Sequence, residues 1–212
     1  VQNFGSKALG RFGGLLRGEV YDLTGLGDRT SVALFSTAEF EEQKTVQLGH
    51  DFAIGGDGLR MFGQFTYSWT DPDLDLPGLD VESETLFASA GLSYPIQRSR
   101  STSHILSGGF DFVDQDLTVN DLRLTRDRVR TVFLRVDSLY ADPDSIAGAN
   151  GFSAFEPRLG ARGGVELRQG IDIFDATPDC RTDPRTCLAG GVAPNRIEAD
   201  PTPLLVRFEG EA

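Results

Sequence analysis

The chain has 212 residues, of which 39% are hydrophobic and 25% are charged, and this balance predicts a folded protein and not a disordered one. Its formal net charge of -12 argues against nucleic acid as a partner, because phosphate binding requires a basic surface. No run of about 18 apolar residues occurs, which excludes a transmembrane helix but not a transmembrane barrel, whose strands alternate apolar and polar side chains.

The sequence begins without an initiator methionine and without the basic and apolar regions of a signal peptide, so it reads as part of a longer protein. The first predicted strand covers residues 12–21, where apolar residues and glycines alternate with Arg17 and Glu19. A period of two residues places successive side chains on opposite faces of a strand. A glycine-rich turn at residues 24–28 and a less regular second strand at residues 31–38 follow.

The clearest pattern lies in residues 45–69, where two alternating runs meet at a glycine-rich turn. The turn is Gly55–Gly58, with the sequence Gly-Gly-Asp-Gly. Two alternating runs on either side of such a turn predict a β-hairpin, with one apolar and one polar face on each strand. The apolar face carries Val46, Leu48, Phe52, Ile54, Leu59, Met61, Phe65, Tyr67 and Trp69.

The same alternation predicts five more strands after a loop at residues 71–80. A break is expected at residues 95–103, because Pro95 cannot donate to a ladder, and a polar connection is expected from residue 113 to about 127. The predicted strands are residues 85–94, 106–112, 131–137, 158–168 and 204–211. About nine strands joined by turns, with no helical period between them, predict an all-β antiparallel meander.

Such a meander can form a soluble sandwich or the wall of a membrane barrel. Two features favour the barrel: the polar face carries full charges of both signs in mid-strand, and the apolar face is light, using glycine and alanine beside leucine and valine. Aromatic residues also close several strands, as residues at a bilayer interface do: Tyr67, Trp69, Tyr94 and Tyr140.

Several short motifs resemble the outer-membrane transporters of bacterial two-partner secretion, the haemolysin-activator and filamentous-haemagglutinin-transporter family. Each motif is short, and their order and spacing over residues 3–130 carry the resemblance. The motifs are Asn3-Phe4-Gly5-Ser6 with Gly10-Arg11, Leu23-Thr24-Gly25-Leu26-Gly27-Asp28, Gly56-Asp57-Gly58-Leu59-Arg60, Gly91-Leu92-Ser93-Tyr94-Pro95-Ile96 with Arg98-Ser99-Arg100, and Asp121-Leu122-Arg123 with Asp127-Arg128-Val129-Arg130.

The resemblance implies a sixteen-stranded outer-membrane barrel that conducts an unfolded exoprotein, preceded by periplasmic domains that recognise it. Residues 1–212 would be about half of the barrel domain, and the family's Val-Arg-Gly-aromatic loop motif is absent from them. In the family's topology, the turns at residues 24–28 and 55–58 would face outside. The loops at residues 71–80 and around Cys180 would face the periplasm.

A barrel of this kind would turn its polar face to a hydrated lumen. Mixed charges there offer no apolar surface to a passing polypeptide, although they could equally serve only to pair across strands and hold the barrel's shape. The residues expected on the lumen side are Arg17, Glu19, Asp51, Arg60, Gln64, Asp111, Arg135, Asp137, Arg158, Arg162, Glu166, Arg168, Arg207 and Glu209.

Two other residue sets invite a chemical interpretation. Cys180 and Cys187 lie in a polar, proline-punctuated loop, where an exported protein would join them in a disulfide. Asp71, Asp73, Asp75 and Glu82 match part of a calcium-loop spacing, but Leu76 stands where that loop needs glycine and no helices flank it, so we expect a solvated turn and no metal.

No catalytic motif is recognisable, and His50 lies on the mostly apolar face of its strand, so we expect neither an enzyme nor a cofactor. The prediction is therefore an outer-membrane pore, with a secreted exoprotein and membrane lipid as its partners. Two alternatives remain open: a barrel-assembly insertase of the same superfamily, and a surface β-sandwich adhesin that binds through acidic loops.

Overall fold

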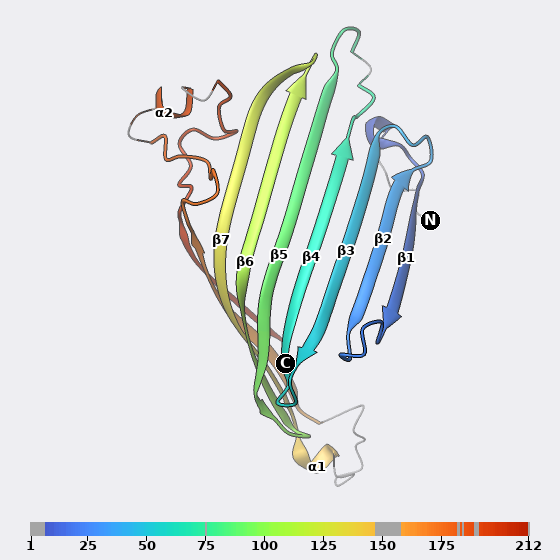
Figure 1. Ribbon diagram of the computed structural model, residues 1–212, viewed down its shortest axis with the longest axis vertical. Coiled ribbons are helices and arrows are strands. Elements are labelled where there is room, and N and C mark those ends of the chain that lie inside the picture. The colour runs from blue at the N-terminus through green and yellow to red at the C-terminus, as the bar shows by residue number, and fades with distance from the viewer. Residues whose placement is uncertain are drawn as a thin grey trace.

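The structure is a computed structural model that describes residues 7–74, 76–146, 158–181, 183, 185–188 and 191–211. The described residues form one nine-stranded antiparallel sheet, in which each strand pairs with its neighbours in the sequence (Figure 1). The strands are β1 (Gly13–Tyr21), β2 (Arg29–Thr37), β3 (Gln43–Ile54), β4 (Leu59–Thr70), β5 (Val81–Arg98), β6 (Thr102–Val119), β7 (Leu122–Ala141), β8 (Gly160–Gly170) and β9 (Leu204–Glu211).

The sheet is curved and open. In Figure 1, β1 to β7 lie side by side, while β8 and β9 turn behind them. β1 and β9 are the two edge strands, and neither pairs with the other. The predicted all-β meander of about nine strands is confirmed. It does not close into a barrel, as we expect of about half of a sixteen-stranded one. The described residues form a single sheet and not the two packed sheets of a sandwich.

Helices contribute little to the described part of the chain. They are a 3-10 turn at Lys7–Leu9 and two four-residue helices, α1 (Pro143–Ile146) and α2 (Arg185–Leu188). None of the described helices is long and apolar enough to cross a membrane.

The predicted break at residues 95–103 was wrong. β5 continues through Pro95 to Arg98, and its register against β6 shifts between Pro95 and Gln97. Pro95 stands opposite Ile105, and Ile96 directly after it is the residue without a partner. The ladder is thus locally interrupted by a bulge beside the proline, which is a place where strands tolerate one. Only residues 99–101 separate β5 from β6.

The polar connection expected up to residue 127 was also wrong. β6 and β7 form a long hairpin that turns at Asn120 and Asp121, whose φ angles of 49° and 63° suit the tight turn. Charged residues take the place of apolar ones in this part of the ladder, where Asp116 pairs with Arg126 and Asp114 with Arg128. The period of two persists, but charged residues carry much of it, so the sequence does not show the apolar alternation by which the other strands are predicted.

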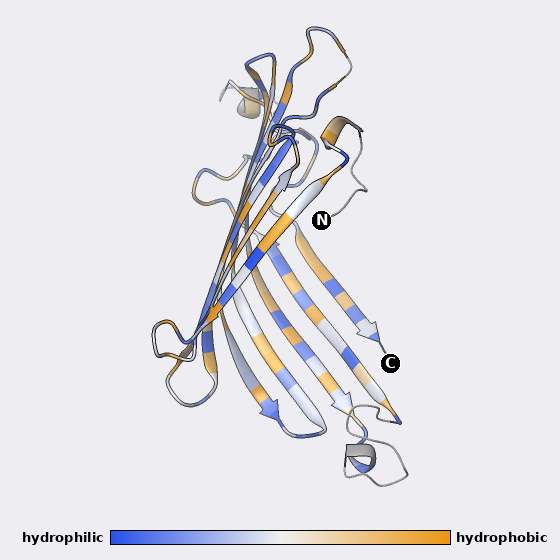
Figure 2. Ribbon diagram, turned by 90° about the vertical axis from the view of Figure 1, so that its right-hand side faces the viewer, coloured by the Kyte–Doolittle hydropathy of each residue, from blue (hydrophilic) through white to orange (hydrophobic). Residues whose placement is uncertain are grey.

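The two faces of the sheet differ sharply, as the alternating colours along the strands in Figure 2 show. Only Ala33, Cys180 and Cys187 are buried hydrophobic residues among those described, so the sheet has no ordinary hydrophobic core. The register places most of the large apolar side chains on one face, which we call the apolar face. Many of them are exposed: Leu16, Val32, Leu34, Leu48, Met61, Trp69, Leu92, Tyr94, Val132, Leu134, Val165, Leu167, Val206 and Phe208.

The strands are long enough for the membrane wall that the sequence predicts. β3 and β4 have 12 residues each, and a tilted strand of about 9 to 11 residues crosses the hydrocarbon of a bilayer. An exposed apolar face on long, tilted strands is the arrangement of a barrel wall turned to lipid.

A pair of glycines lets two strands and two aromatic rings lie close together. Gly91 and Gly109 are opposite each other in β5 and β6. A Cβ added at Gly91 would lie 2.6 Å from the ring of Phe62, and one added at Gly109 would lie 2.9 Å from the ring of Phe133. Both aromatic rings belong to the face opposite the apolar one, so this face is closely filled here.

We therefore expect Gly109→Ala to destabilise the fold by about 1 to 3 kcal/mol, as overpacking does. Gly18→Ala is the matched control, because a Cβ at Gly18 would meet nothing within 4 Å. The measurement is the temperature at which the folded band of the full-length protein converts to the unfolded band on a gel. Equal conversion temperatures for the two variants would contradict the close approach seen in the structure.

Candidate functional site

The candidate site is the face opposite the apolar one, which we call the charged face. Cross-strand pairing defines it, since residues paired directly across a sheet share a face. One row runs through Glu19, Ser31, Gly49, Gln64, Ser89, Asp111 and Thr131, and another through Arg60, Ser93, Ser107, Arg135, Glu166 and Arg207. The remaining candidates Arg17, Asp51, Asp137, Arg162, Arg168 and Glu209 share this face by the same registers.

Arg158 is the exception among the expected lumen residues. It lies before β8, which begins at Gly160 and not at residue 158 as predicted. The sequence predicted a strand from residue 158 because Arg158 continues the alternation of the charged residues that follow it. Strand parity therefore does not assign Arg158 to either face.

The charged residues of β1 to β4 form one group of ion pairs. Asp51 accepts from Arg29 at 3.2 Å and from Arg60 at 2.5 Å, while Arg17 pairs with Glu19 at 2.6 Å. Sequence reasoning missed Arg29, because the predicted second strand begins at residue 31, whereas β2 begins at Arg29. Three arginines here share two carboxylates, so this end of the charged face is locally basic.

A second group spans β6 to β9 and contains the most buried carboxylates of the charged face. Asp111 is 3% exposed and Glu166 is 6% exposed. Arg168 pairs with both of them, at 2.8 Å and 2.6 Å respectively, and Ser89 donates a hydrogen bond of 2.6 Å to Asp111. Buried carboxylates are stable only with such partners.

Two ion pairs of this group reach across an intervening strand. Arg168 on β8 meets Asp111 on β6, and Arg135 on β7 meets Glu209 on β9 at 3.1 Å. Arg135 also pairs with Asp137 at 2.7 Å and approaches Glu166 at 3.6 Å. Side chains converge on the concave side of a curved sheet, so these contacts indicate that the charged face is the concave one.

The charged face is hollowed between the arginines of β1 to β4. A cavity of about 490 Å³ is lined there by small residues such as Ser31, Ala33 and Gly49, with Arg29 and Arg60 beside them. Small side chains in mid-strand leave this space, and the charged rim keeps it polar. The surface is suited to water and to polar polypeptide, not to a tightly held apolar ligand.

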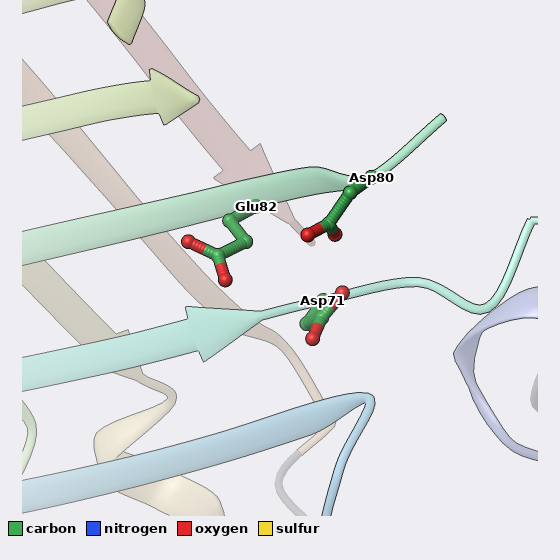
Figure 3. A group of neighbouring side chains, drawn as sticks. All are labelled: Asp71, Asp80 and Glu82. Carbon is green, nitrogen blue, oxygen red and sulfur yellow. The ribbon is translucent and has the colours of Figure 1, made fainter. Parts of the chain in front are cut away.

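The acidic residues after β4 cluster, but not as the calcium-loop spacing predicts. Asp71 and Glu82 come together with Asp80, with carboxylate oxygens within 4.8 Å of one another (Figure 3). Asp73 is not part of the group, and Asp75 lies outside the described residues. Partial loss of hydration, followed by repulsion from the nearby Asp80, raises the pKa of Asp71 above its ordinary value. All three residues are exposed, and exposed carboxylates alone do not make a metal site.

Cys180 and Cys187 are joined by a disulfide, with their Cα atoms 5.9 Å apart. Both side chains are buried, at 2% and 4% exposed. The disulfide lies in the segment between β8 and β9, which packs beside β7. Among the charged groups of this segment, Arg181 lowers the pKa of Asp179 to about 2 by donating hydrogen bonds to its carboxylate.

Arg130 is a further buried charge that sequence reasoning missed. It lies on the apolar face of β7, yet it is 1% exposed. Its guanidinium lies 3.4 Å from the ring centroid of Phe112, pairs with Asp114 at 2.7 Å, and donates to the carbonyl oxygens of Val113 and Phe174. The signal was an alternating series of arginines at 126, 128 and 130, in phase with the apolar residues that follow.

His50 shares the apolar face with Phe52, and their ring centroids are 5.6 Å apart. Its Nδ1 lies 2.9 Å from the hydroxyl of Thr30. This surrounds the imidazole with an aromatic ring and a hydroxyl, and no described carboxylate hydrogen-bonds to it.

Two solved structures share this fold. CdiB from Escherichia coli matches with a TM-score of 0.67 at 16% sequence identity, over 82% of this chain and 31% of that chain. CdiB from Acinetobacter baumannii matches with a TM-score of 0.59 at 12% identity, over 75% of this chain and 28% of that chain. The chain thus spans less than a third of either CdiB chain. No protein-family model matches the sequence, and no curated protein matches it.

Proposed function

We propose that this chain is part of the wall of an outer-membrane pore that secretes an unfolded partner polypeptide in two-partner secretion. The observation that carries the proposal is the open meander itself, with one exposed apolar face and one continuous charged face. Its fold is that of two CdiB structures, and its sequence motifs independently resemble the two-partner secretion transporters.

In this proposal, residues 1–212 belong to the barrel domain, and the free edges of β1 and β9 pair with further strands of the complete wall. The apolar face meets lipid and the charged face meets water. A closed wall would leave no strand edge exposed within the membrane. Such closure is required there, because hydrocarbon offers no hydrogen-bond partners to the backbone groups of a free edge.

The charged face would allow a polypeptide to pass because it binds the polypeptide only weakly. Its arginines are engaged by carboxylates, as Arg135 is by Asp137 and Glu209. Paired charges in water attract a passing chain weakly, and most of the large apolar side chains lie on the other face. The process is passive conduction and uses no cofactor or covalent step.

The test begins with the gene next to the full-length one, which the proposal expects to encode a large exoprotein, and compares secretion of that exoprotein in cells that have or lack the protein. We expect release of the exoprotein into the medium to fall to background without the protein, and the protein to fractionate with the outer membrane. Assembly of unrelated porins is the control, and it should not change. Loss of porin assembly with normal exoprotein release would contradict the proposal and favour a barrel-assembly insertase.

A further inference from the structure

β7 extends well beyond the end of β8. It pairs with β6 from Leu122 onward, but with β8 only from Thr131 to Ala141. The stretch 122–130 therefore has a neighbouring strand on one side alone. The N–H and C=O groups along such an edge form a template on which another extended chain can add as a strand.

A segment between β8 and β9 occupies this edge. The amides of Ile171 and Thr177 donate to the carbonyls of Arg130 and Arg128, at 2.9 Å and 2.8 Å. The amide of Arg126 donates to the carbonyl of Ala193 at 3.0 Å, next to a parallel bridge between Thr125 and Ala193. We call the described part of residues 171–195 the strap.

The strap covers the edge without being a regular strand. The amide of Arg128 is bound by the hydroxyl of Thr177, at 2.7 Å, and not by a carbonyl. Phe174 and Asp175 have positive φ angles of 50° and 55°. The strap therefore occupies the edge of β7. Because its own backbone is irregular, it does not present a continuous row of N–H and C=O groups with which a further strand could pair.

Two features beyond these backbone bonds hold the strap in place. One is Arg130, which donates to the carbonyl of Phe174, together with an ion pair of 3.4 Å between Arg128 and Asp175. The other is the buried disulfide of Cys180 and Cys187, which lies between Thr177 and Ala193, the strap residues that contact β7 on either side of it. Cys187 also lines a small hollow between the strap and Arg126 and Arg128.

We propose that the strap is an edge guard: it occupies the free edge of β7 and, held closed by the disulfide, keeps that edge from pairing with an extended polypeptide. The edge fits an acidic strand best, because Arg126 and Arg128 lie at alternating positions along it and both are partly exposed. Asp175 of the strap already pairs with Arg128. Opening the strap would expose a site for β-strand addition at the end of the sheet.

The first measurement is hydrogen exchange of the full-length protein in detergent. In the variant Cys180→Ser/Cys187→Ser, we expect exchange in residues 122–130 to rise about tenfold to a hundredfold, in line with the loss of a small disulfide-closed loop. Residues 131–141, which β8 covers, should keep their protection. Arg181→Gln is the control, because it removes exposed ion pairs of the strap with Asp179 and Asp200 and leaves the disulfide intact.

The second measurement is binding of a labelled peptide of alternating valine and aspartate to the same proteins. We expect binding to the double serine variant and to the reduced wild-type protein, but not to the oxidised protein. A peptide with proline at alternate positions, which cannot complete the ladder, should not bind. Heat-modifiable migration on a gel shows in each case that the barrel remains folded. If the double serine variant does not assemble, the assembled wild-type protein is reduced instead and used in its place.

Unchanged exchange in residues 122–130 after loss of the disulfide would overturn the proposal. So would faster exchange without peptide binding, or equal binding to the oxidised protein. These outcomes are independent of exoprotein secretion, so failure of the guard is distinguishable from failure of the proposed pore.

Discussion

Leu134→Arg in the full-length protein should sharply reduce the yield of assembled barrel. Leu134 lies on the apolar face of β7 and is 49% exposed, so the proposed wall would turn it to lipid. An arginine facing lipid costs about 2 to 4 kcal/mol near the bilayer midplane. The yield is measured as the heat-modifiable band in the outer-membrane fraction.

Gln64→Arg is the matched control for this prediction. Gln64 is exposed on the charged face and lies in the row of Glu19 and Asp111, where an arginine would meet water. Assembly should remain normal, while conductance or the rate of exoprotein release should change. The membrane wall would be refuted if Leu134→Arg assembled as well as the control, or if the full-length protein stayed soluble and monomeric without detergent.

The second large effect is expected from Arg130→Met. The change removes a buried guanidinium and leaves the carbonyls of Val113 and Phe174 and the carboxylate of Asp114 without their partner. Removing one member of a buried ion pair costs about 3 to 5 kcal/mol. Because Asp114 is 34% exposed, we expect the cost to lie at or below the lower end of this range, measured as a lower conversion temperature of the folded band.

Two controls separate the buried charge from the general loss of an arginine. Arg126→Met breaks a 2.8 Å ion pair with Asp116 in which both side chains are partly exposed, so its effect should stay within about 1 kcal/mol. Arg130→Met/Asp114→Leu removes both charges and should recover part of the loss. A double variant that is no more stable than Arg130→Met would show that the pair is not the source of the effect.

Local sequence patterns predicted a large part of this fold. The glycine-rich turn at Gly55–Gly58 and the alternation on either side of it predicted β3 and β4 and the face on which each residue lies. The same period of two assigned Arg135, Glu166 and Arg207 to a common face. Face assignment is a local property, because successive side chains of any strand point to opposite sides.

Pairing between strands was harder to read. The stretch from residue 113 to 127 looked like a polar connection, because it is rich in charged residues and its apolar residues are few and irregularly placed. Only the register shows that Asp114 and Asp116 stand opposite Arg128 and Arg126. The proline bulge in β5 was missed for a related reason, since the partner strand decides whether a proline interrupts a ladder.

The sequence by itself thus determined that the chain is an antiparallel meander with one apolar and one charged face, because strand periodicity and turn chemistry act over a few residues. Only the tertiary structure decided which charges meet, such as Arg168 with Asp111 across β7, and that a segment far along the chain covers the edge of β7 and buries Arg130. These contacts depend on register and on the curvature of the whole sheet, and both arise from interactions between residues distant in the sequence.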